Sequence, residues 1–147
     1  MRLQGNVLIA APRAKVWSFL TDPEAVAQCT PGLESLTIVE PGRKFRAVAS
    51  VGLGSIKARF TLDVEWLELH EPERALAKAH GTAPGSTADV AGELILRPSG
   101  EASTSLDWSA DVTILGTIAS LASRMMGSVT EKLAGQFFDC VRKKVEA

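Results

Sequence analysis

Residues 118–141 read IASLASRMMGSVTEKLAGQFFDCV, and this stretch decides the fold. Its apolar residues recur at steps of three and four, as they do on one face of an α-helix: Ile118, Leu121, Ala122, Met125, Val129, Leu133, Phe137 and Val141. The period predicts one helix from just after Gly116 to about Lys144, roughly 40 Å long at about 1.5 Å per residue. A helix with a single apolar stripe needs an apolar surface to cover.

The residues before this helix predict that surface, because their period is two. Apolar and polar side chains alternate in residues 2–9 and again, almost throughout, in residues 33–114. Turn sequences separate the alternating runs: Glu40-Pro41-Gly42, Gly52-Leu53-Gly54, Glu71-Pro72-Glu73, Ala83-Pro84-Gly85 and Pro98-Ser99-Gly100. Short connections between alternating strands predict antiparallel hairpins with one face in water.

Two short helices are expected between the first strand and the rest of the sheet. Pro12 suits the first turn of a helix, and Thr21-Asp22-Pro23-Glu24 places a capping side chain before a proline and an acid. The second helix should run from about Pro23 to Gln28 and end at Pro31-Gly32. We therefore predict an α+β helix-grip fold, in which a curved antiparallel sheet wraps around the long C-terminal helix. No repeat or linker divides residues 1–147, which predicts one domain.

Composition excludes several classes of protein. Sixteen basic and 17 acidic residues give a formal net charge of −1, which lacks the concentrated positive charge that nucleic acid requires. Cys29 and Cys140 lie far apart without a CxxC spacing, so we expect two thiols in a reducing compartment rather than a disulfide framework. The N-terminus has no apolar signal core, and no apolar stretch reaches the length of about 18 residues that spans a membrane. A soluble, cytoplasmic protein is expected.

The sequence contains no constellation that predicts catalysis. His70 and His80 are too far apart for a local metal pair and are expected at the surface. A nucleophile elbow, a phosphate loop and an HExxH motif are all absent. General acid–base chemistry needs carboxyl groups pointed into a cleft, yet the alternating carboxylates fall on the polar faces of the strands: Asp63, Glu65, Asp107 and Asp111.

Small side chains predict a cavity between the sheet and the helix. Many inward positions of the strands are alanines: Ala47, Ala49, Ala58, Ala75, Ala77, Ala79, Ala88, Ala102 and Ala110. An apolar void can stay dry and accept an apolar guest. The alternative is that the helix lies closer to the sheet and the space vanishes. Gly127 and Gly135 also have two interpretations. They allow the helix to approach the sheet closely or to kink slightly, or they leave room for a ligand.

Twelve residues are predicted to line this cavity: Trp17, Phe45, Ala47, Ala49, Phe60, Leu62, Ala88, Leu106, Trp108, Leu121, Met125 and Val129. Met125 is a flexible side chain that adapts to irregular surfaces. Trp17 belongs to the short helices expected at the open end of the grip. The alternative is that the methionine and the tryptophans are ordinary core residues.

The chain resembles the CoxG family of carbon monoxide dehydrogenase subunits, a branch of the START-like, polyketide-cyclase-like (SRPBCC) superfamily. An ordered set of residues over essentially the whole chain carries the resemblance: Gly5, Trp17 with Leu20 and Asp22-Pro23, Pro31-Gly32, Val51-Gly52, Phe60, Gly81, Ala91-Gly92, Gly116 before Ile118-Ala119, and Phe137-Phe138. Each piece is weak alone, but their order is fairly specific.

The resemblance implies the helix-grip fold, an apolar cavity and a non-enzymatic accessory role. Family members accompany molybdenum-containing CO dehydrogenases and related hydroxylases and help to recruit them to the inner face of the cell membrane. Because such enzymes pass electrons towards the respiratory chain, a lipid-like quinone is the hypothesised guest, and no other cofactor is expected. The alternatives are a cyclase- or hydrolase-like enzyme that uses the same cavity and a stand-alone lipid carrier.

Many relatives continue after the helix with a linker and an apolar or amphipathic tail, whereas this sequence stops at Ala147. Either the tail is missing here or a partner provides the membrane contact. Arg142-Lys143-Lys144 has two interpretations. The cluster could touch anionic lipid at about 1 kcal/mol per charge, or it is a solvated helix end that complements its own dipole.

Overall fold

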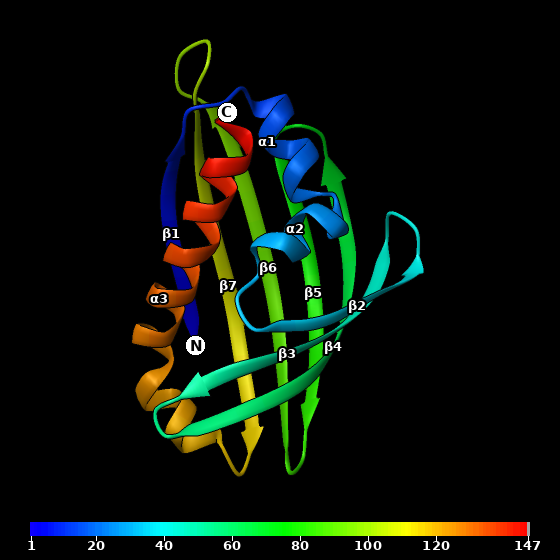
Figure 1. Ribbon diagram of the computed structural model, residues 1–147, viewed down its shortest axis with the longest axis vertical. Coiled ribbons are helices and arrows are strands. Elements are labelled where there is room, and N and C mark those ends of the chain that lie inside the picture. Colours follow the sequence, from blue (N-terminus) through cyan, green and yellow to red (C-terminus); the bar gives the residue numbers. More distant parts are fainter. Residues whose placement is uncertain (147) are drawn as a thin grey trace.

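The computed structural model describes residues 1–146 as a seven-stranded sheet with a long helix across one face (Figure 1). The elements are β1 (Arg2–Ile9), α1 (Arg13–Leu20), α2 (Pro23–Cys29), β2 (Leu33–Glu40), β3 (Lys44–Leu53), β4 (Ile56–His70), β5 (Arg74–Ala83), β6 (Ser86–Pro98), β7 (Thr104–Gly116) and α3 (Ala119–Val145). The strand order is β1-β7-β6-β5-β4-β3-β2, and every neighbouring pair is antiparallel. The predicted helix-grip architecture is confirmed.

The chain connections put all three helices on one side of the sheet. Strands β2 to β7 follow one another as hairpins, while β1 pairs with β7 at the far edge. Helices α1 and α2 therefore connect the two opposite edges, and they lie on the same side as α3 (Figure 1). The sheet curves enough for the β3–β4 turn to reach the start of α3, since a Cβ on Gly54 would lie 3.3 Å from Met125 Sδ.

Local sequence signals explain the short helices. Asp22 Oδ1 accepts hydrogen bonds from the backbone N–H groups of Glu24 and Ala25, at 3.1 and 3.5 Å, and so caps α2 as expected. The helix ends at Cys29, one residue after the predicted end. The strand that was expected to include Ala102 begins instead at Thr104. A hydrogen bond from Ser99 N–H to Ser103 O closes a turn there and leaves Ala102 exposed.

The core forms two clusters, one at each end of α3. The first packs the C-terminal half of α3 and α1 against β1, β5, β6 and β7, and its fully buried members include Ile9, Val16, Leu96, Leu106 and Val141. The second packs the start of α3 against the β3–β4 hairpin, through Leu53, Ala58, Phe60 and Ala122. The helix is therefore anchored at both ends.

Cys29 at the end of α2 and Cys140 on α3 form a disulfide, so the prediction of two free thiols is wrong. The two residues are 111 positions apart, and only the packing of α3 against α2 brings them together. Their spacing in the sequence contains no sign of this pairing. None of the helices within residues 1–146 is both long and apolar enough to cross a membrane.

Gly5 and Gly92 provide a matched test of this packing. A Cβ on Gly5 would lie 2.7 to 2.9 Å from indole atoms of Trp108, whereas the nearest atom to a Cβ on Gly92 is Ser109 O at 3.8 Å. Gly5→Ala should lower the free energy of unfolding by about 1–3 kcal/mol, because the indole must shift. Gly92→Ala should be neutral or slightly stabilising. Urea denaturation measures both, and equal effects would contradict the packing described.

Candidate functional site

Small side chains line the middle of the concave face, between the two core clusters. Ala77, Gly92 and Ala110 are cross-strand neighbours on β5, β6 and β7, and Ala79 pairs with Val90 in the next inward row. All five residues are only half-buried, and none belongs to either cluster. Ala79 and Val90 also border a hollow on the opposite face of the sheet. Since α3 crosses the concave face, the partial exposure of Ala77, Gly92 and Ala110 indicates that the helix does not fill the centre of the grip.

The facing wall of this space comes from α3. Leu133 lies four residues from both Val129 and Phe137, on the same stripe of the helix, and it too is half-buried and outside both clusters. Met125 is half-buried one turn before Val129. On the sheet side, the inward positions of the described strands β3 to β7 carry no charged side chain, and their polar members, Ser86 and Thr104, lie at strand ends. Both walls of the space are therefore apolar.

A groove of about 440 Å³ opens along the side of this space, between β1 and α3. Leu3, Gly5, Val7 and Trp108 line it from the sheet, and Gly127, Thr130, Ala134, Gly135 and Phe138 line it from the helix. A Cβ on Gly127 or Gly135 would meet no atom within 4 Å, so the interpretation of these glycines as a close approach to the sheet is wrong. The helix glycines border open space.

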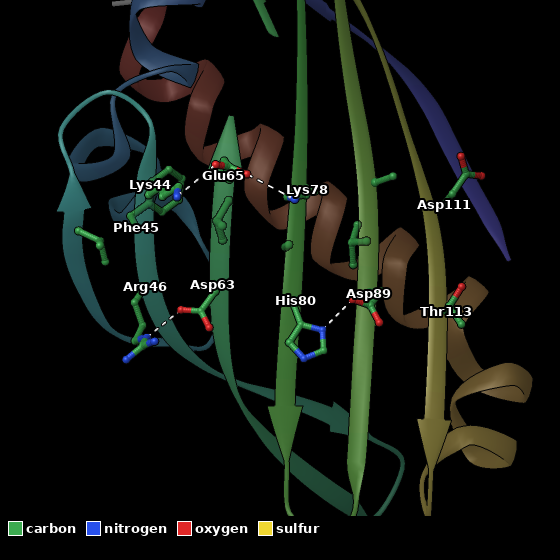
Figure 2. Close-up of a pocket in the computed structure, with 15 residues that line it drawn as sticks. Lys44, Phe45, Arg46, Asp63, Glu65, Lys78, His80, Asp89, Asp111 and Thr113 are labelled. Atoms are coloured by element: carbon green, nitrogen blue, oxygen red, sulfur yellow. Dashed lines mark hydrogen bonds and ion pairs between the residues drawn. The ribbon is translucent and has the colours of Figure 1, made fainter. Parts of the chain in front are cut away.

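A second hollow, of about 720 Å³, lies on the outer face of the sheet, which is turned away from α3 (Figure 2). Charged side chains form rows across the strands there, and α3 lies behind them in the view. Arg46 Nε is 2.8 Å from Asp63 Oδ1, and His80 Nδ1 is 2.7 Å from Asp89 Oδ1. The outward position expected for His80 is confirmed.

Glu65 is the least exposed carboxylate of this outer hollow, with 17% of its side chain accessible. Its partial desolvation would raise its pKa, but Lys44, Lys78 and Arg43 at 3.5 Å outweigh that effect and lower the pKa below the ordinary value. Glu65 is therefore ionised at neutral pH and forms ion pairs with all three cations. Within residues 1–146, no group of three or more His, Cys, Asp or Glu side chains is arranged to hold a metal ion.

A family comparison assigns this arrangement of sheet and helix. The family model for CoxG, a carbon monoxide dehydrogenase subunit, matches residues 5–146, nearly the whole chain. The chain belongs to the CoxG family. The resemblance seen in the sequence is thereby confirmed. A comparison with curated proteins found no match.

Solved structures share the fold of this CoxG protein. A conserved protein from Geobacillus kaustophilus superposes with a TM-score of 0.91 at 23% identity, covering 99% of this chain and 95% of that one. The Zhui aromatase/cyclase from Streptomyces sp. R1128 gives 0.77 at 20% identity, with 99% and 93% covered. A START superfamily protein from Mycobacterium smegmatis gives 0.75 at 17%, with 99% and 97% covered. At these identities the likeness shows the START-like helix-grip fold alone.

The twelve residues predicted to line the cavity of this CoxG protein do not gather in one place. Trp17, Leu106 and Trp108 belong to the cluster at the C-terminal half of α3, and Phe60, Leu62, Ala88, Leu121 and Val129 to the other. Ala47 and Ala49 are buried on β3, Phe45 is half-buried beside them, and Met125 lies near the β3–β4 turn. These residues lie at the two ends of the space, and the role of these twelve side chains in ligand binding stays a prediction.

The residues at the centre were outside that set: Ala77, Ala79, Val90, Gly92 and Ala110. Their alternation marks them as inward-facing, and three of them are among the alanines noted in the sequence. What placed them at the centre is strand register, which sets Ala77 opposite Gly92 and Gly92 opposite Ala110. Register depends on contacts between strands that a single sequence does not reveal.

The helix glycines give a direct test of the open groove. Gly135→Ala and Gly127→Ala should each raise the free energy of unfolding by up to about 1 kcal/mol, because alanine favours the helix and its Cβ meets nothing. Thermal unfolding followed by circular dichroism measures the effect. A fall in stability for either variant would show that the helix packs more tightly at that glycine than the structure indicates.

Proposed function

We propose that this CoxG protein is a non-enzymatic carrier of a hydrophobic, lipid-like molecule, with a quinone as its guest, and that it serves a CO dehydrogenase or a related molybdenum hydroxylase. The observation that carries the proposal is the unfilled centre of the grip. A face lined by Ala77, Gly92 and Ala110 stays partly exposed beneath a helix of 27 residues. Apolar surface left open in this way favours a guest that covers it.

The groove between β1 and α3 supports a guest with a polar end. Trp108 lies where the apolar space meets this groove, and its indole offers an aromatic face together with an N–H donor. Thr130 adds a hydroxyl group from the helix side, and the outer rim is polar at Gln4 and Glu131. A quinone matches this arrangement, because it combines a flat ring, carbonyl acceptors and an apolar tail.

The family and the end of α3 support the proposed partner and location. In this proposal the carrier works in the cytoplasm and touches the inner face of the cell membrane peripherally. Arg142, Lys143 and Lys144 occupy the last turn of α3. Arg142 is engaged by Leu8 O at 3.2 Å and Asp139 at 3.3 Å, whereas Lys143 and Lys144 are exposed. Each lysine could contribute about 1 kcal/mol at an anionic surface.

The competing function, a cyclase- or hydrolase-like enzyme, needs an acid or base that points into the same space. The inward positions of strands β3 to β7 carry no such group. The carboxylates that line the groove, Glu131 and Asp139, are exposed on α3, and the others described above lie on the outer face. This distribution of charge favours carriage of a molecule over its conversion.

A pair of alanine variants tests the carrier function. Ala79→Leu adds bulk at the centre of the concave face, while Ala91→Leu adds the same bulk on the outer face of the neighbouring strand. Titration with ubiquinone-1 should quench tryptophan fluorescence in the wild type. Binding should weaken at least about tenfold, or 1.4 kcal/mol, in Ala79→Leu and stay unchanged in Ala91→Leu.

Two other results of this titration are informative. Absence of quenching in the wild type, or equal binding by both variants, would contradict binding of a quinone in the grip. If the wild type binds a fatty acid but not ubiquinone-1, and Ala79→Leu weakens that binding, the carrier function would be supported and the quinone contradicted as its ligand.

A further inference from the structure

The groove between β1 and α3 differs at its two ends. Helix α3 runs alongside β1 and in the same direction (Figure 1). At one end Phe138 is buried, at 6% exposure, and Arg142 Nε donates a hydrogen bond to Leu8 O at 3.2 Å. Leu3 and Gly127 line the other end, where a Cβ on Gly127 would meet no atom within 4 Å. The helix is therefore tied to β1 near its C-terminus, and the groove is open near Gly127.

The open end of the groove adjoins the centre of the grip. Strand register pairs Leu3 of β1 with Ala110 of β7, and Ala110 with Gly92 of β6. Leu3 therefore continues the row of small residues across the concave face, and its side chain is half-buried. Because neighbouring strands lie about 4.8 Å apart, only about 10 Å separates Leu3 from Gly92. A molecule in the open end of the groove has a short path to the apolar space.

The indole of Trp108 forms part of the sheet side of the groove. A Cβ on Gly5 would lie 2.7 to 2.9 Å from three atoms of this ring, so the ring lies over the backbone of Gly5. A side chain at position 5 would push the indole away from β1. The absence of one leaves the indole against the strand, and the groove between strand and helix stays passable.

We propose that the Leu3–Gly127 end of this groove is the portal through which a single-tailed amphiphile enters and leaves the apolar space. The tail passes between β1 and α3 towards Ala110 and Gly92, and the polar end stays at the polar rim of the groove. Gly127 keeps the portal open, because any larger side chain there would project into the groove. The portal rests on the proposed function, since it serves the same space.

Gly127→Phe tests the portal, with Ser128→Phe as the matched control. Ser128 is exposed on the same turn of α3 and does not line the groove. Stopped-flow quenching of tryptophan fluorescence by ubiquinone-1 gives both rate constants. Gly127→Phe should slow association and dissociation alike, at least about tenfold, because a blocked portal raises the barrier and leaves the free and bound states unchanged. The Kd should therefore stay the same, and Ser128→Phe should match the wild type.

Two other kinetic results would overturn the portal. A weaker Kd with an unchanged association rate would make Gly127 a wall of the binding site instead of part of the way into it. Unchanged rate constants in Gly127→Phe would show that the molecule enters elsewhere. Thermal unfolding checks that both variants are folded, and phenylalanine is a better helix former than the glycine that it replaces.

Acrylamide quenching tests the opening without any ligand. In a Trp66→Phe background two indoles remain, and Trp108 is the more accessible because Trp17 is only 4% exposed. Adding Gly127→Phe should reduce the quenching constant several-fold, and adding Ser128→Phe should leave it unchanged. Equal quenching with both substitutions would overturn the portal. Shielding by Gly127→Phe, with no binding of ubiquinone-1 to the wild type, would support the opening and contradict the carrier function.

Discussion

The structure depends on how α3 covers the concave face of the sheet. An antiparallel sheet with one apolar face must bury that face, and α3 carries the long apolar stripe that does so. Phe138, Val141 and Val145 pack at one end and Ala122 at the other. Between them β5, β6 and β7 present a row of small residues, Ala77, Gly92 and Ala110. Helix and sheet are held apart at the centre by contacts made at the ends. An apolar space follows directly from that arrangement.

Much of this architecture could be predicted from the sequence. A change of period from two to about 3.6 near Gly116 gave the sheet and α3, and Asp22-Pro23 gave the start of α2 to the residue. These signals are local, so one sequence suffices to read them. The centre of the site, in contrast, is formed by residues that are distant in the sequence. It depends on the register that aligns Ala77, Gly92 and Ala110, and the disulfide depends on the return of α3 to α2 across 111 residues. Neither is visible in spacing.

Charged and apolar side chains lie on opposite faces of the sheet. The outer face pairs its charges across neighbouring strands, as Arg46 does with Asp63 and Lys44 with Glu65. Such exposed pairs contribute little stability individually, yet they keep the edges and outer surface polar. The inward positions of β3 to β7 carry no charged side chain, and their polar residues, Ser86 and Thr104, lie at strand ends. A protein built in this way is suited to hold an apolar molecule.

The most direct test of the central claim is a crystal of the protein pressurised with xenon, because xenon enters dry apolar cavities. We expect density for xenon, or for a molecule retained from purification, between Gly92 on β6 and Leu133 on α3. A crystal in which Leu133 packs directly on Gly92 and Ala77, with neither xenon nor a retained molecule between helix and sheet, would contradict the account.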